Sequence, residues 1–201
     1  MAGASVVGNV YDKYGTRNPI ARALMRGFLE AVTDLYRVAA PRRVLEVGCG
    51  EGRLARALWE ASPAVPERFE ITDVDVSRVD PGLPERIRVR EASIYDLPYD
   101  DDAFDLVVCC EVLEHLEHPG KGLAEVARVA SRRVLLSTPW EPVWRAMNVA
   151  RGKYLLQLGN TPGHVQHFTR RGLERFARSH LRLLERRTPL PWTILLGEPH
   201  R

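Results

Sequence analysis

The stretch VLEVGCGEGRL, residues 44–54, decides the fold of this chain. Its apolar run ends at Val47, glycines follow at alternate positions (Gly48, Gly50 and Gly52), and a helical pattern comes next. Glycine adopts backbone angles closed to other residues, and its missing side chain lets a ligand lie against the main chain. The free amides at the start of the following helix favour a negative ligand group. We therefore expect a strand, a ligand-binding glycine loop and a helix.

Strand-like and helix-like segments alternate along most of the chain. Strands are predicted at residues 43–47, 69–74, 87–91, 104–110, 133–137, 181–186 and 192–196. Helices are predicted at residues 20–39, 52–61, 121–130 and 169–179, the first after the start signal Asn18-Pro19 and the last capped by Thr169. This alternation predicts an α/β fold with a mainly parallel sheet wrapped on both faces, and such sheets bind ligands beyond the carboxyl ends of their strands.

Composition places the chain among globular proteins with one domain, residues 1–201. The 26 acidic residues nearly balance the 29 basic ones, so charge gives little reason to expect a nucleic-acid partner. The start of the chain lacks the features of a secretory signal, and no apolar run approaches the roughly 20 residues of a membrane span. The spacing of the three cysteines fits neither disulfides nor a zinc site. A cytoplasmic protein is expected, with peripheral membrane contact left open.

Two regions fall outside the alternation. Residues 1–19 are interpreted as an N-terminal flap, or alternatively as a plain lead-in, and residues 139–168 as a lid or substrate insert. The aromatic residues expected to hold a substrate there are Tyr11, Tyr14, Trp140 and Trp144. Basic residues in the insert leave an anionic or membrane-associated substrate open.

The glycine spacing separates the candidate ligands. A dinucleotide fingerprint reads Gly-x-Gly-x-x-Gly, whereas the third glycine here comes one residue early, at Gly52, which counts against NAD. A phosphate loop ends in Gly-Lys-Ser/Thr, which is missing from this sequence, so ATP is not expected.

The same loop closely resembles motif I of the class I S-adenosylmethionine-dependent methyltransferases. Three further segments, residues 72–77, 92–105 and 110–116, resemble the later motifs of that family in the correct order. Together the motifs cover about residues 43–138 and are similar to those of the ubiquinone and menaquinone biosynthesis methyltransferases. The resemblance implies a three-layer, Rossmann-like, doubly wound fold whose seven-stranded sheet is mainly parallel with an antiparallel final strand.

The resemblance also implies which residues hold the cofactor, S-adenosylmethionine. These are Glu46, Gly48, Cys49, Gly50, Asp73 or Asp75, Ser93, Ile94, Cys110 and Glu111. Glu46 would contact the amino group, and Asp75 aligns best with the ribose-binding acid, with Asp73 as the alternative. Ser93 stands where the family usually has Asp, so the adenine would depend more on Ile94.

The implied reaction is direct transfer of the sulfonium methyl group to an O, N or C atom of a small-molecule acceptor, leaving S-adenosylhomocysteine. Histidine titrates near neutrality, so His115, His164 and His167 are candidates for proton transfer, with structural roles as the alternative. His115 and His118 lie three residues apart, as do His164 and His167, but neither pair has a clear third ligand. No metal ion is therefore expected.

Two other functions remain open from the sequence. The first is a non-catalytic protein that binds S-adenosylmethionine or acts as a scaffold, because an intact cofactor site does not prove turnover. The second is an NAD-dependent oxidoreductase, against which the glycine spacing counts. The oligomeric state is left open between a monomer and a homodimer.

Overall fold

The computed structural model describes residues 18–150, 157–161 and 163–201. One sheet has the strand order β3-β2-β1-β4-β5-β7-β6. The strands are β1 (Arg43–Val47), β2 (Arg68–Asp73), β3 (Ile87–Glu91), β4 (Phe104–Cys110), β5 (Ala130–Pro139), β6 (Leu181–Arg187) and β7 (Trp192–Pro199). The helices are α1 (Pro19–Ala39), α2 (Arg53–Ala61), α3 (Pro119–Val129), α4 (Glu141–Ala150) and α5 (Arg170–Ala177), with 3-10 turns η1 (Val76–Arg78) and η2 (Leu113–His115).

The sheet confirms the predicted fold. Strands β3, β2, β1, β4 and β5 pair in parallel, whereas β7 runs antiparallel to both of its neighbours, β5 and β6. The chain moves outward from β1 in both directions, so β1 and β4 mark the point where the strand order reverses. Crevices at such a reversal are the usual ligand sites of open α/β sheets.

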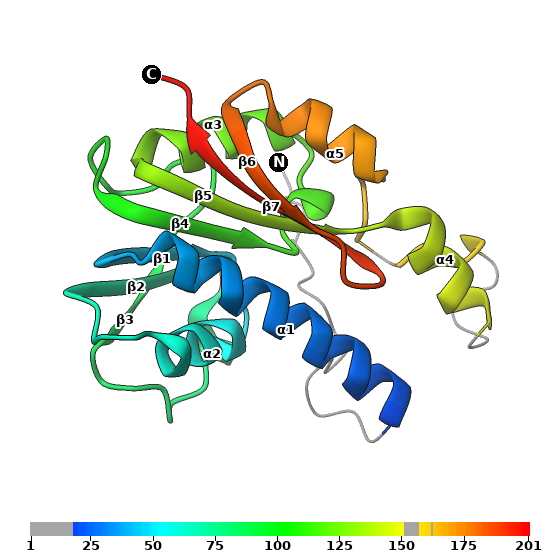
Figure 1. The fold of residues 1–201 in the computed structure, drawn as a ribbon, viewed down its shortest axis with the longest axis horizontal. Coiled ribbons are helices and arrows are strands. Elements are labelled where there is room, and N and C mark those ends of the chain that lie inside the picture. Colours follow the sequence, from blue (N-terminus) through cyan, green and yellow to red (C-terminus); the bar gives the residue numbers. More distant parts are fainter. Residues whose placement is uncertain (1–17, 151–156, 162) are drawn as a thin grey trace, which may run out of the picture.

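Helices cover both faces of this sheet, as the near-continuous apolar strands require. Figure 1 shows α1 and α2 on one face and α3 and α5 on the other, and each pair packs on its own cluster of buried side chains. Helix α1 begins as predicted, because the Asn18 side chain accepts a hydrogen bond from Ile20 N at 2.9 Å. It ends at Ala39, the cap residue Ala40 lies in the left-handed region, and Pro41 follows.

Most elements differ from their predicted bounds by one or two residues, and β7 runs three residues further, to Pro199. Helix α3 begins two residues early, at Pro119, because proline suits the first position of a helix. Strand β5 is longer at both ends, since its pairing with β7 continues to Pro139. The region at residues 139–168 contains the helix α4, which follows β5 past the edge of the sheet (Figure 1). The predicted flap, with Tyr11 and Tyr14, lies outside the described residues apart from its last two positions.

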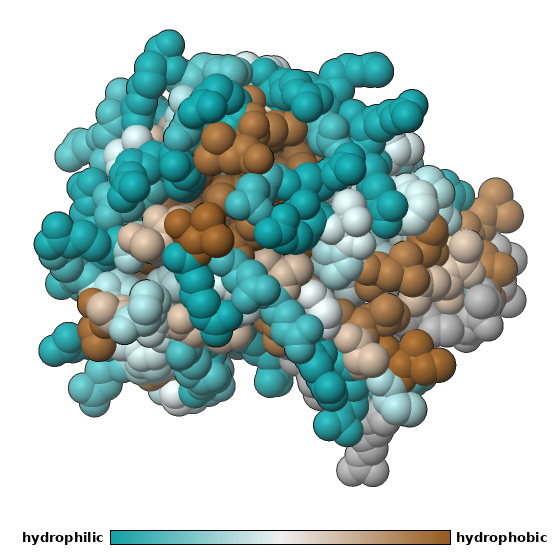
Figure 2. All heavy atoms as spheres, in the orientation of Figure 1, coloured by the Kyte–Doolittle hydropathy of each residue, from teal (hydrophilic) through white to brown (hydrophobic). Residues whose placement is uncertain are grey.

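The helices within the described ranges are too short or too polar to cross a membrane. Figure 2 shows hydrophobic residues gathered over the end of the molecule where α4 lies. Val149 on α4 and Leu158 after it are among the exposed apolar side chains of this end.

Candidate active site

The glycine loop after β1 is fixed to the end of β2 by its own backbone. The amides of Gly48 and Cys49 both donate to Thr72 O, at 2.7 and 3.0 Å. Gly48 has φ +75°, and a Cβ atom there would lie 2.3 Å from a methyl carbon of Val112. This position therefore requires glycine for both its backbone angle and its close packing.

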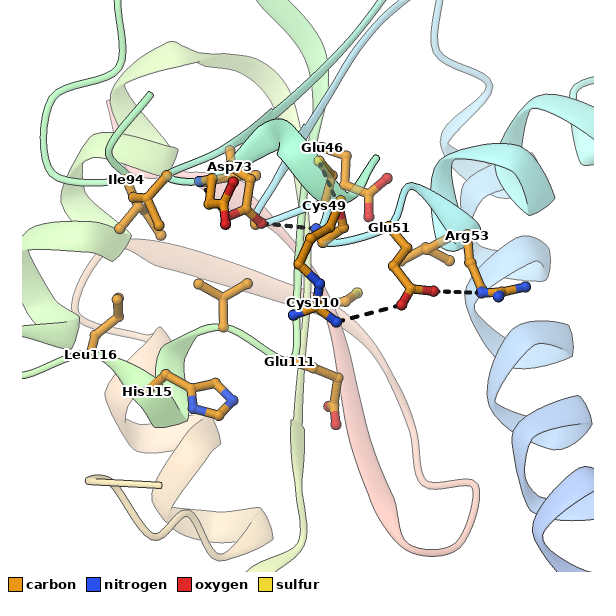
Figure 3. Close-up of a pocket in the computed structure, with 18 of the residues that line it drawn as sticks. Glu46, Cys49, Glu51, Arg53, Asp73, Ile94, Cys110, Glu111, His115 and Leu116 are labelled. Carbon is orange, nitrogen blue, oxygen red and sulfur yellow. Dashed lines mark hydrogen bonds and ion pairs between the residues drawn. The ribbon is translucent and has the colours of Figure 1, made fainter. Parts of the chain in front are cut away.

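A cavity of about 480 Å³ opens beside this loop, at the carboxyl ends of β1, β2 and β4 (Figure 3). Its volume lies in the usual range of small-molecule sites. All ten residues predicted to bind the cofactor line it: Glu46, Gly48, Cys49, Gly50, Asp73, Asp75, Ser93, Ile94, Cys110 and Glu111. The sequence motifs, which come from four separate loops, are thus brought to one place.

Glu46 is a buried acid on the wall of this cavity. It is only 3% exposed, and its Oε2 atom has no hydrogen-bond partner among the residues that the structure describes. Burial, together with the nearby charge of Asp73, raises the pKa of Glu46 to about 8. A buried carboxyl group with an unused oxygen matches a ligand that brings its own ammonium group, as the amino group of S-adenosylmethionine does.

Asp73 and Asp75 have different surroundings. Asp73 is used by the backbone: one carboxylate oxygen accepts from Gly50 N at 2.8 Å and the other from Asp75 N at 3.2 Å. Asp75 is exposed at the cavity and starts the turn η1 by accepting from Ser77 N at 3.0 Å. Hydrogen bonds from the side chain and backbone of Ser77 lower the pKa of Asp75, which keeps it ionised. Asp73 thus shapes the loop, and Asp75 presents a carboxylate to the cavity.

Ser93 and Ile94, predicted at the adenine end of the cofactor, and Glu111, predicted at its methionine end, have different surroundings. Ser93 accepts a hydrogen bond from Tyr95 N at 3.2 Å, and Ile94 is buried beside it. Glu111 has φ +61°, and its side chain accepts from the Ser137 hydroxyl at 3.0 Å and from Trp192 Nε1 at 2.8 Å. Glu111 precedes the short turn η2, and its side chain is held by residues of β5 and β7.

Three apolar residues of the cavity wall lie outside the sequence motifs. Met25 and Phe28 come from α1, and Trp192 begins β7. The rings of Phe28 and Trp192 lie 4.9 Å apart between centroids. Phe28 is one of many apolar positions at helical spacing, so the sequence pattern gives no signal that it belongs to the site.

The predicted substrate residues Trp140 and Trp144 are not among the described residues that line the cavity. Trp144 lies directly behind its wall, with its ring 5.8 Å from that of Trp192 and its Nε1 donating to the Thr161 hydroxyl at 2.9 Å. The guanidinium group of Arg170 stacks over Trp140 at 3.8 Å. Trp144 therefore connects α4 to the cavity wall, whereas Trp140 packs outside it.

The three candidate histidines occupy different places. His115 lines the cavity, and its Nδ1 lies 2.9 Å from Gly163 O. His164 is buried, with Nδ1 at 2.6 Å from a carboxylate oxygen of Glu141. The His167 side chain is 43% exposed and lies 3.8 Å from the other Glu141 oxygen. The structure thus brings only His115 of the three to the cavity, and Glu141 is a partner that sequence reasoning missed.

This fold, with a glycine loop, a buried acid and an exposed acid around one cavity, defines a class I S-adenosylmethionine-dependent methyltransferase domain. Residues 18–180 match the family model described as a methyltransferase domain, and the chain belongs to that family.

Two relatives that are named as methyltransferases support the same class of enzyme. The ubiquinone/menaquinone biosynthesis C-methyltransferase of Burkholderia mallei is 30% identical over 169 residues, which are 78% of this chain and 69% of the relative. The demethylmenaquinone methyltransferase of Deinococcus radiodurans is 35% identical over 121 residues, 57% of this chain and 50% of the relative. The chain spans 22 to 50% of the length of three curated relatives, the Deinococcus protein included.

A solved structure shows the same fold. The magnesium protoporphyrin IX methyltransferase of Synechocystis, solved with bound S-adenosylhomocysteine, has a TM-score of 0.64 at 16% sequence identity. The match covers 97% of this chain and 91% of that one. At this identity the likeness is one of fold, and the cofactor assignment depends on the motifs and the cavity.

Proposed function

We propose that this protein transfers the methyl group of S-adenosylmethionine directly to a small-molecule acceptor in the cytoplasm. The observation that carries the proposal is the buried Glu46, which lines the cavity beside the glycine loop and has one oxygen without a hydrogen-bond partner among the described residues. Glu46 binds the ammonium group of the cofactor, and Asp75 accepts hydrogen bonds from the ribose hydroxyls. Ile94 packs against the adenine.

The cofactor supplies an electrophilic methyl group on a positively charged sulfur, so the protein mainly has to align the two reactants and exclude water. Glu46 and the glycine loop fix one end of the donor. The apolar wall of Met25, Phe28 and Trp192 keeps water from the reacting end of the cavity.

An acceptor with an apolar or aromatic part fits this wall best. We propose that it enters beside His115 and that residues 139–168 close over it, because Trp144 connects α4 to Trp192. The flap at residues 1–19 is proposed to complete the enclosure. The carbonyl oxygen of Gly163 can only accept a hydrogen bond, so Nδ1 of His115 must donate to it. Nε2 of His115 is then the nitrogen placed to take a proton from the substrate.

Calorimetry with S-adenosylhomocysteine and NAD tests the cofactor. We expect S-adenosylhomocysteine to bind with one site per chain and NAD to bind at least about 100-fold more weakly, a difference of ~2.7 kcal/mol. Preference for NAD would refute the proposal. Tight binding of S-adenosylhomocysteine without methyl transfer to any member of a broad metabolite panel would favour a non-catalytic binding protein.

A second prediction distinguishes the roles of Asp73 and Asp75 in cofactor binding. Asp75→Ala should weaken S-adenosylhomocysteine binding by about 10- to 100-fold, because hydrogen bonds to a charged group contribute roughly 1.5–3 kcal/mol. Asp73→Ala should weaken binding less and lower the melting temperature more, since it leaves the amides of Gly50 and Asp75 without their acceptor. Calorimetry and thermal unfolding of both variants provide the comparison, and the reverse order in affinity would assign the ribose to Asp73.

A further inference from the structure

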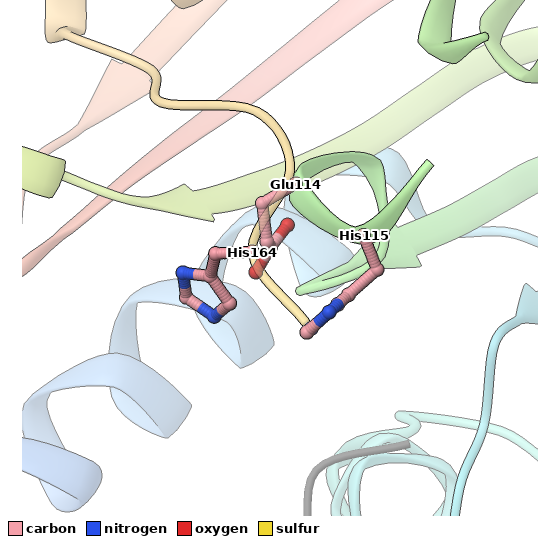
Figure 4. A group of neighbouring side chains, drawn as sticks. All are labelled: Glu114, His115 and His164. Carbon is pink, nitrogen blue, oxygen red and sulfur yellow. The ribbon is translucent and has the colours of Figure 1, made fainter. Parts of the chain in front are cut away.

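A cluster of three metal-binding side chains lies next to the cofactor cavity (Figure 4). Glu114, His115 and His164 each offer one ligand atom, and these atoms all lie within 4.8 Å of one another. Figure 4 shows the Glu114 carboxylate directed toward the His164 ring, with His115 beside them. The sequence paired His115 with His118 and His164 with His167, whereas the structure joins one histidine of each pair to an acid.

The two segments that carry these side chains are fastened together by hydrogen bonds. The backbone oxygen of Glu114 accepts from Val165 N at 2.9 Å and from Gln166 N at 3.0 Å. The Gln166 side chain also donates to Leu116 O at 3.1 Å. Turn η2 and residues 163–166 therefore form one rigid unit, although about 50 positions separate them in the sequence.

Both histidines are held in the state that binds a metal ion. Nδ1 of His115 faces a backbone carbonyl oxygen, and Nδ1 of His164 faces the carboxylate of Glu141. These oxygens accept hydrogen bonds, so each Nδ1 donates, and Nε2 is the ring nitrogen that can offer a lone pair to a metal ion. Metal-ligating histidines are usually oriented in this way, by a carboxylate or a carbonyl on the other ring nitrogen.

His164 supplies independent evidence that something binds here. Its side chain is 1% exposed, and its Nε2 has no hydrogen-bond partner among residues 18–150, 157–161 and 163–201. A buried acceptor of this kind is costly unless a donor or a cation reaches it. The buried carboxylate of Glu114 nearby favours a cation.

We propose that Glu114, His115 and His164 bind one divalent transition-metal ion. Two neutral imidazoles and one carboxylate suit ions such as Zn²⁺, and three protein ligands leave at least one position open. Ligand atoms about 2.1 Å from a common ion stand about 3.5 Å apart, so the three atoms draw together by about 1 Å when the ion binds. Glu141 acts as a positioning residue, because it orients the His164 ring.

The ion lies at the wall of the cofactor cavity, because His115 belongs to both sites. Its open position gives the acceptor a point of attachment through oxygen, so the site selects hydroxyl-bearing acceptors. This last step rests on the proposed methyl transfer. In the metal-bound protein, His115 holds the ion through Nε2 and does not act as the proton acceptor.

Metal titration of the chelator-treated full chain tests the site. Zn²⁺ should bind with one equivalent by calorimetry, and Co²⁺ used as a spectroscopic probe should give visible absorption bands of a nitrogen- and oxygen-ligated ion. His164→Ala and His115→Ala should each weaken Zn²⁺ binding by at least about 100-fold, and Glu141→Gln by about 10-fold. His118→Ala is the matched control and should leave the affinity unchanged.

The proposal is overturned if the full chain takes up no stoichiometric Zn²⁺, or if uptake survives in His115→Ala. The His115 variant decides the matter even if His164→Ala fails to fold, since His115 is only half-buried. Binding of S-adenosylhomocysteine is measured on the same samples. If that ligand binds and Zn²⁺ does not, the metal site fails alone; if Zn²⁺ binds and that ligand does not, the proposed function fails alone.

Discussion

Glu46→Gln is expected to weaken S-adenosylhomocysteine binding by about 30- to 100-fold, while the ligand-free protein becomes more stable. The variant loses the charge that pairs with the ligand's ammonium group, and a buried charge-assisted hydrogen bond contributes roughly 2–3 kcal/mol. It also removes a carboxyl group whose ionised form is disfavoured by burial. Calorimetry and chemical denaturation of the same variant measure the two opposite effects.

The stability effect has a defined pH dependence. The pKa of Glu46 is about 8 in the folded protein against an ordinary 4.5, so the folded state keeps a proton that the unfolded state has released. The contribution of this group to stability therefore falls as pH rises from about 4.5 to about 8. The advantage of Glu46→Gln over the unmodified protein should widen across that window and be constant above it.

Glu70 provides a matched control with the opposite sign. Glu70 is as buried as Glu46, and burial alone would raise its pKa. Hydrogen bonds from Arg68 at 2.7 Å and from Tyr99 at 2.8 Å outweigh this effect and leave the pKa of Glu70 below its ordinary value. Glu70→Gln should therefore destabilise the protein near neutral pH and leave ligand binding intact. The role assigned to Glu46 would be contradicted if both variants were more stable than the unmodified protein. It would also be contradicted if the difference in unfolding free energy between Glu46→Gln and the unmodified protein did not change with pH.

Gly48→Ala is expected to destabilise the protein by about 2–5 kcal/mol and to abolish measurable cofactor binding. The left-handed backbone at Gly48 costs an alanine roughly 1–2 kcal/mol, and the contact of its Cβ with Val112 adds the cost of overpacking, typically 1–3 kcal/mol. Relief of the contact moves Val112 or the loop, and both line the cavity. Denaturant unfolding and calorimetry measure the two losses.

Gly50→Ala is the control for this prediction. Gly50 also has a positive φ, of +54°, but a Cβ atom there meets nothing within 4 Å. Its replacement should cost only the backbone strain, about 1–2 kcal/mol. Equal destabilisation by the two substitutions would show that packing against Val112 is unimportant, and partial recovery in Gly48→Ala combined with Val112→Ala would show the reverse.

The sheet and the cofactor side of the site were predictable from sequence because their signals are local. Apolar runs such as residues 104–110 are typical of strands buried on both faces, and the spacing of Gly48, Gly50 and Gly52 is a property of one short loop. The carboxyl ends of parallel strands then bring Glu46 and Asp75 together without further information.

The rest of the site depends on contacts between distant segments. Trp192 reaches the cavity because β7 inserts next to β5, and the hydrogen-bonded residues Glu141 and His164 lie 23 positions apart in the sequence. The cluster of Glu114, His115 and His164 arises only when residues 163–166 dock on η2. No periodicity or motif records such docking, so the sequence pattern could not bring these three residues together.

Because β7 lies between β5 and β6 in the sheet, β5 lacks one neighbouring strand until the ribosome has made the C-terminal part of the chain. Pro139 ends β5 and Trp192 begins β7, and the two residues pair in the sheet. At a synthesis rate of 5–20 residues per second, the ribosome needs about 3 to 10 seconds to make the residues between them. During that time the edge of β5 is an unpaired template for other strands. A newborn chain thus passes through an aggregation-sensitive interval, which ends when the C-terminal hairpin arrives and supplies the last wall of the cavity.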